Sequence, residues 1–377
     1  MNIPDGASEL IWIVAGSYTA LMLFLFAAFG REETSHSSAA PHISVIVCAR
    51  NEENNIPALV ESLMGQTYRH AEFILVNDRS TDRTRILLDA VTKQDSRFRV
   101  VEIREQTSSL PPKKRAITEG IRAATGEIIC LTDADCLPPP GWIEHLVNKF
   151  TPEVGLVAGF SPYQFARMTE AHPGIRALVG FVRFEETLTS FLAASAAKAG
   201  FPWLCSGRNL AYRRVVFDEV EGFEANKHSV SGDDDLFLQS VRKRTAWRIL
   251  YTTDSFTFVP TTPPLRWVDF FNQRLRHFSD GKFYLPSVQL FLFLYHTANL
   301  IILAYFVSAL TGFVPLSVGI GSLGLKLFAD AVVLYRASRT FNEPISLTAF
   351  IPNCLAYIFY NILIGPLGFV GKFTWKK

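Results

Sequence analysis

The distribution of hydrophobic and polar residues divides the chain into apolar ends and a middle part with an alternating pattern. No charged residue occurs in Leu10–Phe29, which as a helix is about 30 Å long, enough to span the hydrocarbon core of a bilayer. A second charge-free stretch covers Phe283–Leu325, and a third covers Pro344–Gly371. The pattern therefore predicts membrane helices at both ends of the chain.

The second stretch is long enough for more than one helix. Thr311–Pro315 predicts a turn inside it, so two spans fit at roughly 285–310 and 316–335. The later span contains Lys326 and Asp330, which stand four residues apart and would share one helix face. We expect them to neutralise each other or to serve a substrate, because charges inside a membrane are functional candidates. Arg336 and Arg339 would end this helix on the cytosolic side.

The orientation of these helices follows from the charges beside them. Asp5 and Glu9 precede the first apolar stretch, where a cleaved signal peptide would carry basic residues. We therefore expect a retained anchor with its N-terminus outside. Simple alternation of spans would then place Lys372, Lys376 and Lys377 outside, against the positive-inside tendency. Either the last segment is a re-entrant hairpin or that rule is broken, and the sequence leaves both open.

The middle of the chain alternates short apolar runs with helical patterns. Strands are predicted at 43–48, 72–76, 99–103 and 127–132, and helices at 56–64, directly after Ser80, and at 115–124. Such an alternation indicates βαβ units and a largely parallel sheet. In such sheets the ligand binds beyond the carboxyl ends of the strands.

Polar clusters follow three of the predicted strands. They are Arg50–Glu52, Asn77–Asp78 and Asp133–Asp135. No glycine-rich phosphate loop of the Walker or dinucleotide type is present, so phosphate has to be bound in another way. Asp133 and Asp135, two residues apart at a strand end, should point to the same side. Paired carboxylates of this kind suit Mg²⁺ or Mn²⁺ bound together with substrate phosphates.

Three consecutive acids, Asp233, Asp234 and Asp235, precede a further helical pattern. At least one of them can cap that helix, because acids are favoured at helix N-termini. Three together repel one another, which a cap alone would not require. One carboxylate with a raised pKa would be suited to act as a general base.

Residues 265–278 form an amphipathic pattern, with apolar residues at Leu265, Val268, Phe271, Leu275 and Phe278. The pattern predicts a helix in the membrane interface just before the C-terminal spans. Its arginines would meet lipid headgroups or bind a diphosphate, since guanidinium matches phosphate geometry. Residues 175–199 suggest a second interfacial helix.

Composition agrees with a protein that is partly embedded in a membrane. Of the 377 residues, 49% are hydrophobic and only 19% are charged, below the norm of about 25% for soluble proteins. The formal net charge of +2 argues against a nucleic-acid binder. The five cysteines form no CxxC pair, which favours reduced thiols without a metal.

Taken in order, the motifs resemble those of the membrane-integrated family 2 glycosyltransferases, which include cellulose, chitin, hyaluronan and poly-N-acetylglucosamine synthases and ceramide glucosyltransferase. The resemblance extends over about residues 43–285. It is carried by the segments Val45–Glu52, Val76–Asp82, Lys113–Ile117, Leu131–Asp135, Gly207–Arg214, Gly232–Leu236 and Gln273–His277. It implies an α/β fold of the GT-A type, which is a Rossmann-like nucleotide-sugar-binding domain with a mostly parallel sheet, and transmembrane helices at both ends.

The resemblance also implies roles for individual residues. Asp133 and Asp135 would bind the metal, Asp234, or as second choice Asp233, would be the catalytic base, and His277 would face the acceptor. The implied nucleotide-sugar ligands are Ala49, Arg50, Glu52, Asp78, Lys113, Lys114, Asp133, Gln273, Arg274 and Arg276. His277 stands where processive synthases have a Trp of the acceptor platform, which puts processive polymerisation in question.

The implied division of the chain is an anchor at 1–31, a cytosolic catalytic domain at 42–262, an interface helix at 263–283 and a C-terminal region of two to three spans at 284–377. The implied reaction is inverting transfer of a sugar from a nucleotide-sugar, most plausibly linked to UDP, to a lipid or glycan acceptor. A bacterial inner membrane is the implied location. The alternatives are a processive polysaccharide synthase, a nucleotidyltransferase and a non-catalytic membrane scaffold.

Overall fold

A computed structural model describes residues 5–30, 40–104, 109–164 and 173–370 and shows two compact units. One unit, termed here the sheet unit, consists of Arg31–Arg167 and Gly200–Pro263. The other, the helical unit, consists of Met1–Gly30, Met168–Ala199 and Pro264–Lys377. Residues 168–199, which lie inside the predicted 42–262 segment, are thus part of the helical unit.

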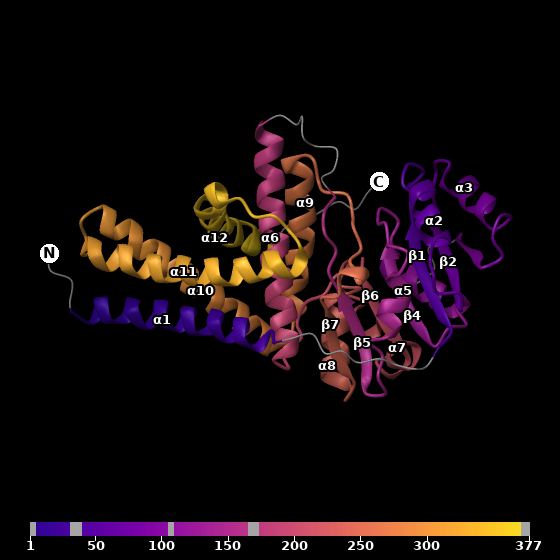
Figure 1. Ribbon diagram of the computed structural model, residues 1–377, viewed down its shortest axis with the longest axis horizontal. Coiled ribbons are helices and arrows are strands. Elements are labelled where there is room, and N and C mark those ends of the chain that lie inside the picture. Colours follow the sequence, from indigo (N-terminus) through magenta and orange to yellow (C-terminus); the bar gives the residue numbers. More distant parts are fainter. Residues whose placement is uncertain (1–4, 31–39, 105–108, 165–172, 371–377) are drawn as a thin grey trace. The chain divides into compact units, whose positions relative to one another are not determined.

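The sheet unit is built on a seven-stranded sheet with the order β3-β2-β1-β4-β6-β5-β7 (Figure 1). The strands are β1 (Ile43–Ala49), β2 (Ala71–Asp78), β3 (Phe98–Ile103), β4 (Ile128–Asp133), β5 (Val154–Gly159), β6 (Leu210–Arg213) and β7 (Arg248–Thr252). Only β6 runs against its two neighbours, β4 and β5, among the described strands. The predicted, mostly parallel sheet is confirmed, and all four predicted strands lie within one or two residues of β1 to β4.

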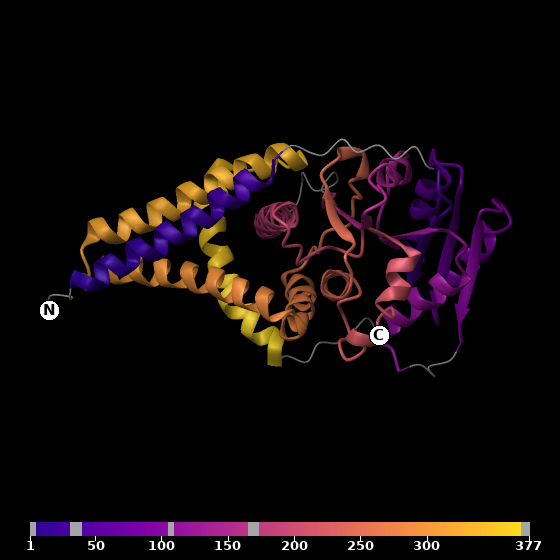
Figure 2. The same cartoon turned by 90° about the horizontal axis from the view of Figure 1, so that it is seen from below.

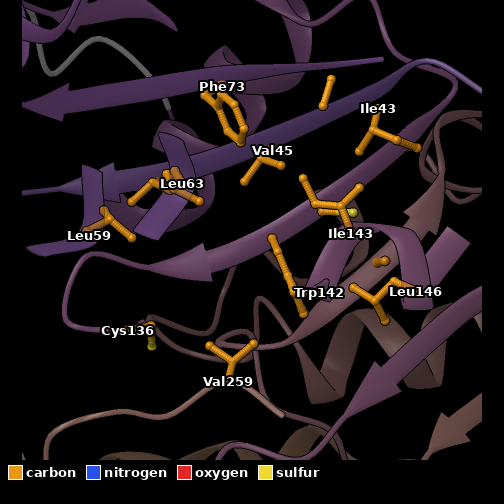
Figure 3. Packing of buried hydrophobic residues seen from close by; sticks show 14 of the residues in the cluster. Ile43, Val45, Leu59, Leu63, Phe73, Cys136, Trp142, Ile143, Leu146 and Val259 are labelled. Atoms are coloured by element: carbon orange, nitrogen blue, oxygen red, sulfur yellow. The ribbon is translucent and has the colours of Figure 1, made fainter. Parts of the chain in front are cut away.

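The helices of this unit are α2 (Ile56–Met64), α3 (Thr84–Val91), α4 (Pro112–Ala123), α5 (Trp142–Val147), α7 (Arg214–Glu219) and α8 (Asp235–Arg244), with short 3₁₀ turns η1 (Glu224–Asn226) and η2 (Ser255–Thr257). On one face of the sheet, alternate residues of β1 pack with α2 and α5 into a continuous core (Figure 3). Val45, Phe73 and Trp142 are completely buried in it. On the other face α4 approaches so closely that a Cβ on Gly120 would lie 2.6 Å from Ile46 Cγ2, which explains glycine there.

The strand order places the carboxyl ends of β1, β2 and β4 next to each other. From β1 the chain proceeds to β2 and β3 on one side and returns to β4 on the other, so β1 and β4 flank the point where the order reverses. Cys48 of β1 is the register partner of Asp133 of β4, and Ala49 is the partner of Asn77 of β2. The polar segments that follow β1, β2 and β4 therefore share one edge of the sheet, as the sequence predicts.

The helical unit contains α1 (Asp5–Ala28), α6 (Pro173–Lys198), α9 (Trp267–Phe278), the 3₁₀ turn η3 (Ser279–Phe283), α10 (Pro286–Leu310), α11 (Leu316–Phe341) and α12 (Leu347–Val370). Four segments are long and apolar enough to cross a membrane, namely Glu9–Ala28, Pro286–Leu310, Leu316–Phe341 and Leu347–Gly368. The expected helices at both ends of the chain are confirmed. α11 continues through Arg336 and Arg339, six residues beyond the predicted 335, and Asn342 in the left-handed conformation ends it.

Lys326 and Asp330 are buried charges of the helical unit, and they are paired. Lys326 and Asp330 form the expected ion pair within α11, and Asp330 also accepts a hydrogen bond of 2.6 Å from the Tyr18 hydroxyl of α1. The two charges therefore neutralise each other, and Tyr18 of α1 is a third partner in this contact.

Candidate functional site

Two interlocked loops form one side of the shared sheet edge. Asn51 after β1 and Arg79 after β2 both have a positive φ, of 55° and 57°. The side-chain oxygen of Asn51 accepts a hydrogen bond from Thr81 N at 2.8 Å, and Ser80 Oγ accepts one from Asn51 N at 3.1 Å. These bonds hold two residues in a conformation that costs of the order of 1–3 kcal/mol each. The loops are therefore fixed in shape before any ligand arrives.

The predicted nucleotide residues of these loops differ in their surroundings. Ala49 is buried at the end of β1. Glu52 accepts a hydrogen bond from Asn55 Nδ2 at 2.6 Å. The Nε atom of Arg50 is buried and has no hydrogen-bond partner among the described residues. Because buried donors are nearly always bonded in native proteins, this nitrogen is a candidate for contact with a ligand or water.

Asp78 is held by two guanidinium groups at the end of β2. Arg79 Nε lies 2.9 Å and Arg115 Nη2 3.1 Å from Asp78 Oδ1, and Asp78 and Arg115 are both buried. Arg115 belongs to the Lys113–Ile117 motif, but its role on Asp78 was not foreseen from the sequence. Two guanidinium groups on one buried carboxylate fix its direction.

Asp133 and Asp135 lie at the end of β4. The strand ends at Asp133, so the strand period that predicted a common side for the two acids stops there. Nevertheless both are partly exposed while Ala134 between them is buried. The thiol of Cys136 donates to Asp135 Oδ1 at 3.7 Å. Two partly exposed carboxylates thus lie at the edge of the sheet, one directly before and one directly after the buried Ala134 in the sequence.

Lys113 connects Asp133 to the acidic cluster. Its Nζ lies 3.1 Å from Asp133 Oδ1 and 3.1 Å from Asp233 Oδ2. Lys113 is in the first turn of α4 and Asp233 precedes α8, so three separate segments meet at one ammonium group. This contact brings together two groups of residues that are about 100 positions apart in the chain.

The neighbouring Lys114 has different partners. Its side chain is completely buried and its Nζ donates to the carbonyl oxygens of Asn226 and Ser229, at 2.6 and 2.9 Å. Adjacent helix positions point about 100° apart, so the two lysines cannot both face the sheet edge. Lys114 fixes the turn after η1, and Lys113 is the lysine that lies at the sheet edge with the acids.

The three consecutive acids occupy three environments. Asp234 caps α8, and its two carboxylate oxygens accept hydrogen bonds from Asp235 N at 2.8 Å and Gly207 N at 2.9 Å. Asp233 and Asp235 are buried, whereas Asp234 is partly exposed. Gly207 belongs to a motif for which the sequence offered no role. A side chain there would press on the carboxylates, since its Cβ would lie 3.1 Å from Asp233 Oδ2.

Within this acidic cluster the raised pKa belongs to Asp233, the second choice for the general base. Burial raises the pKa of this carboxyl above its ordinary value, Lys113 opposes that shift, and the charges of Asp234 and Asp133 add to it. Burial likewise raises the pKa of the Cys48 thiol, whose neighbours include Lys113 and Asp133. Cys48 is therefore a neutral side chain within this set of charges.

The segment Gln273–His277 lies on α9 in the helical unit. Arg274 is buried and pairs with Glu185 and Glu186 of α6, and its guanidinium carbon lies 5.3 Å from the centre of the Phe270 ring. Arg276 is partly exposed, and its Nη2 lies 3.4 Å from Nε2 of His277. Gln273 Oε1 is buried without a hydrogen-bond partner among the described residues. Arg274 therefore anchors α9 to α6, which is a different use from the predicted contact with a nucleotide.

A divalent cation fits the Asp133–Asp135 edge only if a substrate completes its ligands. In the described ranges no group of three or more His, Cys, Asp or Glu side chains is placed to hold a metal. Mg²⁺ and Mn²⁺ are commonly held by one or two carboxylates together with phosphate oxygens and water. The two half-exposed acids match that requirement.

Comparisons with known proteins show which proteins the chain resembles in sequence and in fold. Residues 44–221 match Glycosyl transferase family 2. The β-monoglucosyldiacylglycerol synthase of Synechocystis sp. is 31% identical over 242 residues, which are 62% of this chain and 48% of that protein. An uncharacterized glycosyltransferase of Haemophilus influenzae is 34% identical over 108 residues, 29% of this chain and 32% of that protein. The chain thus spans between a third and a half of the length of these relatives.

Among solved structures, the mannosyltransferase PcManGT from Pyrobaculum calidifontis, in complex with GDP-Man and Mn²⁺, has a similar fold. The TM-score is 0.56 at 20% sequence identity, and the match covers 94% of this chain and 99% of that chain.

The environment of Asp233 leads to a prediction about stability. A carboxyl with a raised pKa in the folded state binds its proton more tightly there, so its ionisation destabilises the fold once the pH exceeds about 4, the ordinary Asp value. We expect Asp233→Asn to raise the free energy of unfolding at pH 7 relative to wild type, and this gain should shrink as the pH falls toward 4. Denaturation of both proteins in detergent across that range measures the difference, with Asp89→Asn on the exposed side of α3 as the control. A constant difference at all pH values would contradict this assignment.

Proposed function

We propose that this protein, whose residues 44–221 match Glycosyl transferase family 2, transfers a sugar with inversion from a nucleotide-sugar, a UDP-sugar in our assignment, to a lipid or glycan hydroxyl. The observation that carries this proposal is the meeting of Asp133, Asp233 and Lys113 at the carboxyl edge of the sheet. Candidate metal ligands and candidate proton acceptors are thereby in one place.

The relatives support a lipid acceptor in particular. The name of the Synechocystis relative describes the synthesis of a monoglucosylated diacylglycerol. Four helices of this chain are long and apolar enough to cross a membrane, which would hold the active site near a lipid substrate. His277 in place of an acceptor-platform Trp favours transfer of a single sugar over processive synthesis.

We assign Asp133 and Asp135 to a divalent cation, Mg²⁺ or Mn²⁺. A cation there would act as a Lewis acid that neutralises the leaving diphosphate. The Pyrobaculum mannosyltransferase, whose structure is a complex with GDP-Man and Mn²⁺, is consistent with this assignment. Lys113 is in contact with Asp133, and its ammonium group would also interact with the diphosphate.

The nucleoside would bind over the interlocked loops. We assign Ala49, Arg50, Glu52 and Asp78 to the base and ribose, because they follow β1 and β2 at the edge where ligands of such sheets bind. Arg276, with Gln273, is our candidate for a further contact with the diphosphate, while Arg274 is assigned to holding α9 in place.

Asp234 is our candidate for the general base. Of the three consecutive acids it is the one that is partly exposed, so an acceptor hydroxyl can reach it. The N–H groups of Gly207 and Asp235 fix its direction, and each oxygen keeps a second lone pair for the proton. The acceptor oxygen would form its bond to the anomeric carbon as the proton passes to Asp234 and the nucleoside diphosphate leaves from the opposite face. Asp233 would act indirectly, by holding Lys113.

The catalytic side of the membrane is inferred from charge. Arg336 and Arg339 lie in the last turns of α11, and Arg336 donates to the carbonyl oxygen of Gly30 at the end of α1. Positive residues concentrate on the cytoplasmic side of membranes. We therefore assign this end of α11, and the sheet unit that follows Gly30, to the cytoplasmic side of a bacterial inner membrane.

The proton transfer can be tested with Asp234→Asn. Asn also caps helices well, so the fold should persist, and loss of the general base should lower the transfer rate by about 10²–10⁴-fold.

Membranes containing the protein are incubated with nucleotide-sugars labelled in the sugar or in the nucleotide, and lipid-soluble and polymeric products are separated. The sugar label alone should enter the product.

Binding of the nucleotide to the Asp234→Asn variant should remain normal, which is the control for folding. Transfer at a rate near wild type would refute the assignment of the base. Entry of the nucleotide label into the product would instead indicate a nucleotidyltransferase.

The metal ligands can be tested with Asp135→Asn, which keeps the size of the side chain. We expect Mn²⁺ to strengthen UDP binding to the wild-type protein and to have little effect on the variant, because one of two protein ligands is lost. Calorimetry of UDP binding with and without Mn²⁺ provides the measurement, and Asp89→Asn, on the exposed side of α3, is the matched control. Equal enhancement by Mn²⁺ in wild type and variant would exclude Asp135 as a ligand.

A further inference from the structure

Three helices of the helical unit form a bundle whose directions follow from their contacts. α1 and α11 run parallel, because residues further along α1 contact residues further along α11. The contacts are Trp12 with the site of Gly321, Tyr18 with Asp330, and Phe26 with Arg336. α10 is antiparallel to α11, since the two are joined by the short segment 311–315 and Gly319 abuts Ala309.

The bundle therefore has two distinct ends. The turn end contains Thr311–Pro315 and the beginning of α1. The other end, termed here the near end, contains Gly30, the first turn of α10 at Pro286 and the last turn of α11 at Phe341. Gly30 is the last described residue before the sheet unit in the sequence.

α12 starts from the near end. Glu343, four residues before this helix, donates its N–H to Ser338 O at 3.1 Å and accepts from Ser338 Oγ at 2.6 Å, which ties it to the end of α11. Its carboxylate pairs with Arg183 of α6 at 3.0 Å. The segment that leads into α12 is thus fixed at the near end by two separate contacts.

α12 also finishes at the near end. A Cβ on Gly368 would lie 2.5 Å from Phe278 Cβ and 3.2 Å from Ser279 N, so the end of α12 is packed against the junction of α9 and η3. That junction belongs to the start of α10, because Gln289 Nε2 donates to the carbonyl oxygens of Gly281 and Lys282 at 3.0 and 3.1 Å. Between its ends, Tyr360 of α12 packs on Phe270 and Phe278 of α9.

A straight helix of 24 residues is about 36 Å long, enough to cross a bilayer. With both of its ends at the near end of the bundle, however, it cannot do so. Figures 1 and 2 show α12 crossing the common direction of α1, α10 and α11 instead of running along it. The apolar character of α12 therefore reflects contact with lipid and protein and does not show that the helix crosses the membrane.

We propose that α12 lies within one leaflet and does not cross the membrane, so that the chain crosses the membrane three times. Its exposed apolar residues Ile351, Phe359, Leu363 and Leu367, which are multiples of four positions apart, contact the acyl chains of the leaflet at the near end. This inference concerns the arrangement in the membrane and stands apart from the transfer chemistry.

The distribution of charge supports three crossings. Lys282, Arg336 and Arg339 lie at the near end, while the 311–315 turn carries no charge. With α12 confined to one leaflet, the chain enters Lys372, Lys376 and Lys377 from the near side as well, so the basic residues obey the positive-inside tendency. Four crossings would put these three lysines on the outside.

The number of crossings can be measured with paired reporters on the full chain. Alkaline phosphatase, active only outside, and a fluorescent protein, fluorescent only inside, are fused in turn before Met1, within the 311–315 turn and after Lys377. Three crossings predict that the two ends of the chain lie on opposite sides, with the turn on the side of Met1. Both ends on the same side would overturn the proposal.

A second measurement does not depend on fusions. Leu347→Cys and Leu367→Cys, each exposed and about 30 Å apart along α12, are labelled with a fluorophore in proteoliposomes of uniform orientation. A membrane-impermeant quencher added on one side should reach both labels or neither, and Leu310→Cys at the turn end should respond from the other side. Quenching of the two α12 labels from opposite sides would show a crossing helix and contradict the inference.

Discussion

The ammonium group of Lys113 is the interaction on which the catalytic edge depends. Asp133 and Asp233 come from segments that are far apart in the chain, and two carboxylates brought this close would repel each other in a buried setting. One lysine from the first turn of α4 touches both and offsets that repulsion. The sheet brings the segments to the same edge, and the contacts with Lys113 hold the two carboxyl groups together there.

The rest of the site is arranged around this contact by backbone rather than by further charges. Gly207 and Asp235 direct the Asp234 carboxylate through N–H groups, and the loops after β1 and β2 fix each other through Asn51 and Ser80. Such a preorganised edge costs stability, as the positive φ angles of Asn51 and Arg79 and the raised pKa of Asp233 indicate. The core between β1, α2 and α5 supplies the compensating stability.

Strands β1 to β4 and the edge at which their polar residues meet could be predicted from the sequence, because both depend on local patterns and on the geometry of parallel sheets. The roles of adjacent residues could not. Lys113 and Lys114 are equivalent in the sequence, yet a rotation of about 100° places one at the site and the other on carbonyl oxygens. Arg274 and Arg276 differ in the same way, since the partner of Arg274 lies on α6, nearly 90 positions away. For the last apolar segment the sequence left two possibilities open, a re-entrant hairpin or a broken positive-inside rule, because hydropathy records apolar length and carries no information about where a helix ends.

The claim that Lys113 binds both acids can be tested most directly by a double-mutant cycle with Lys113→Met and Asp233→Asn. The account predicts that the free energies of unfolding at pH 7 are non-additive by about 1–3 kcal/mol, because the Asp233 carboxylate is more unfavourable without its lysine. Additive effects within about 0.3 kcal/mol would show that the two side chains do not interact and would contradict the account.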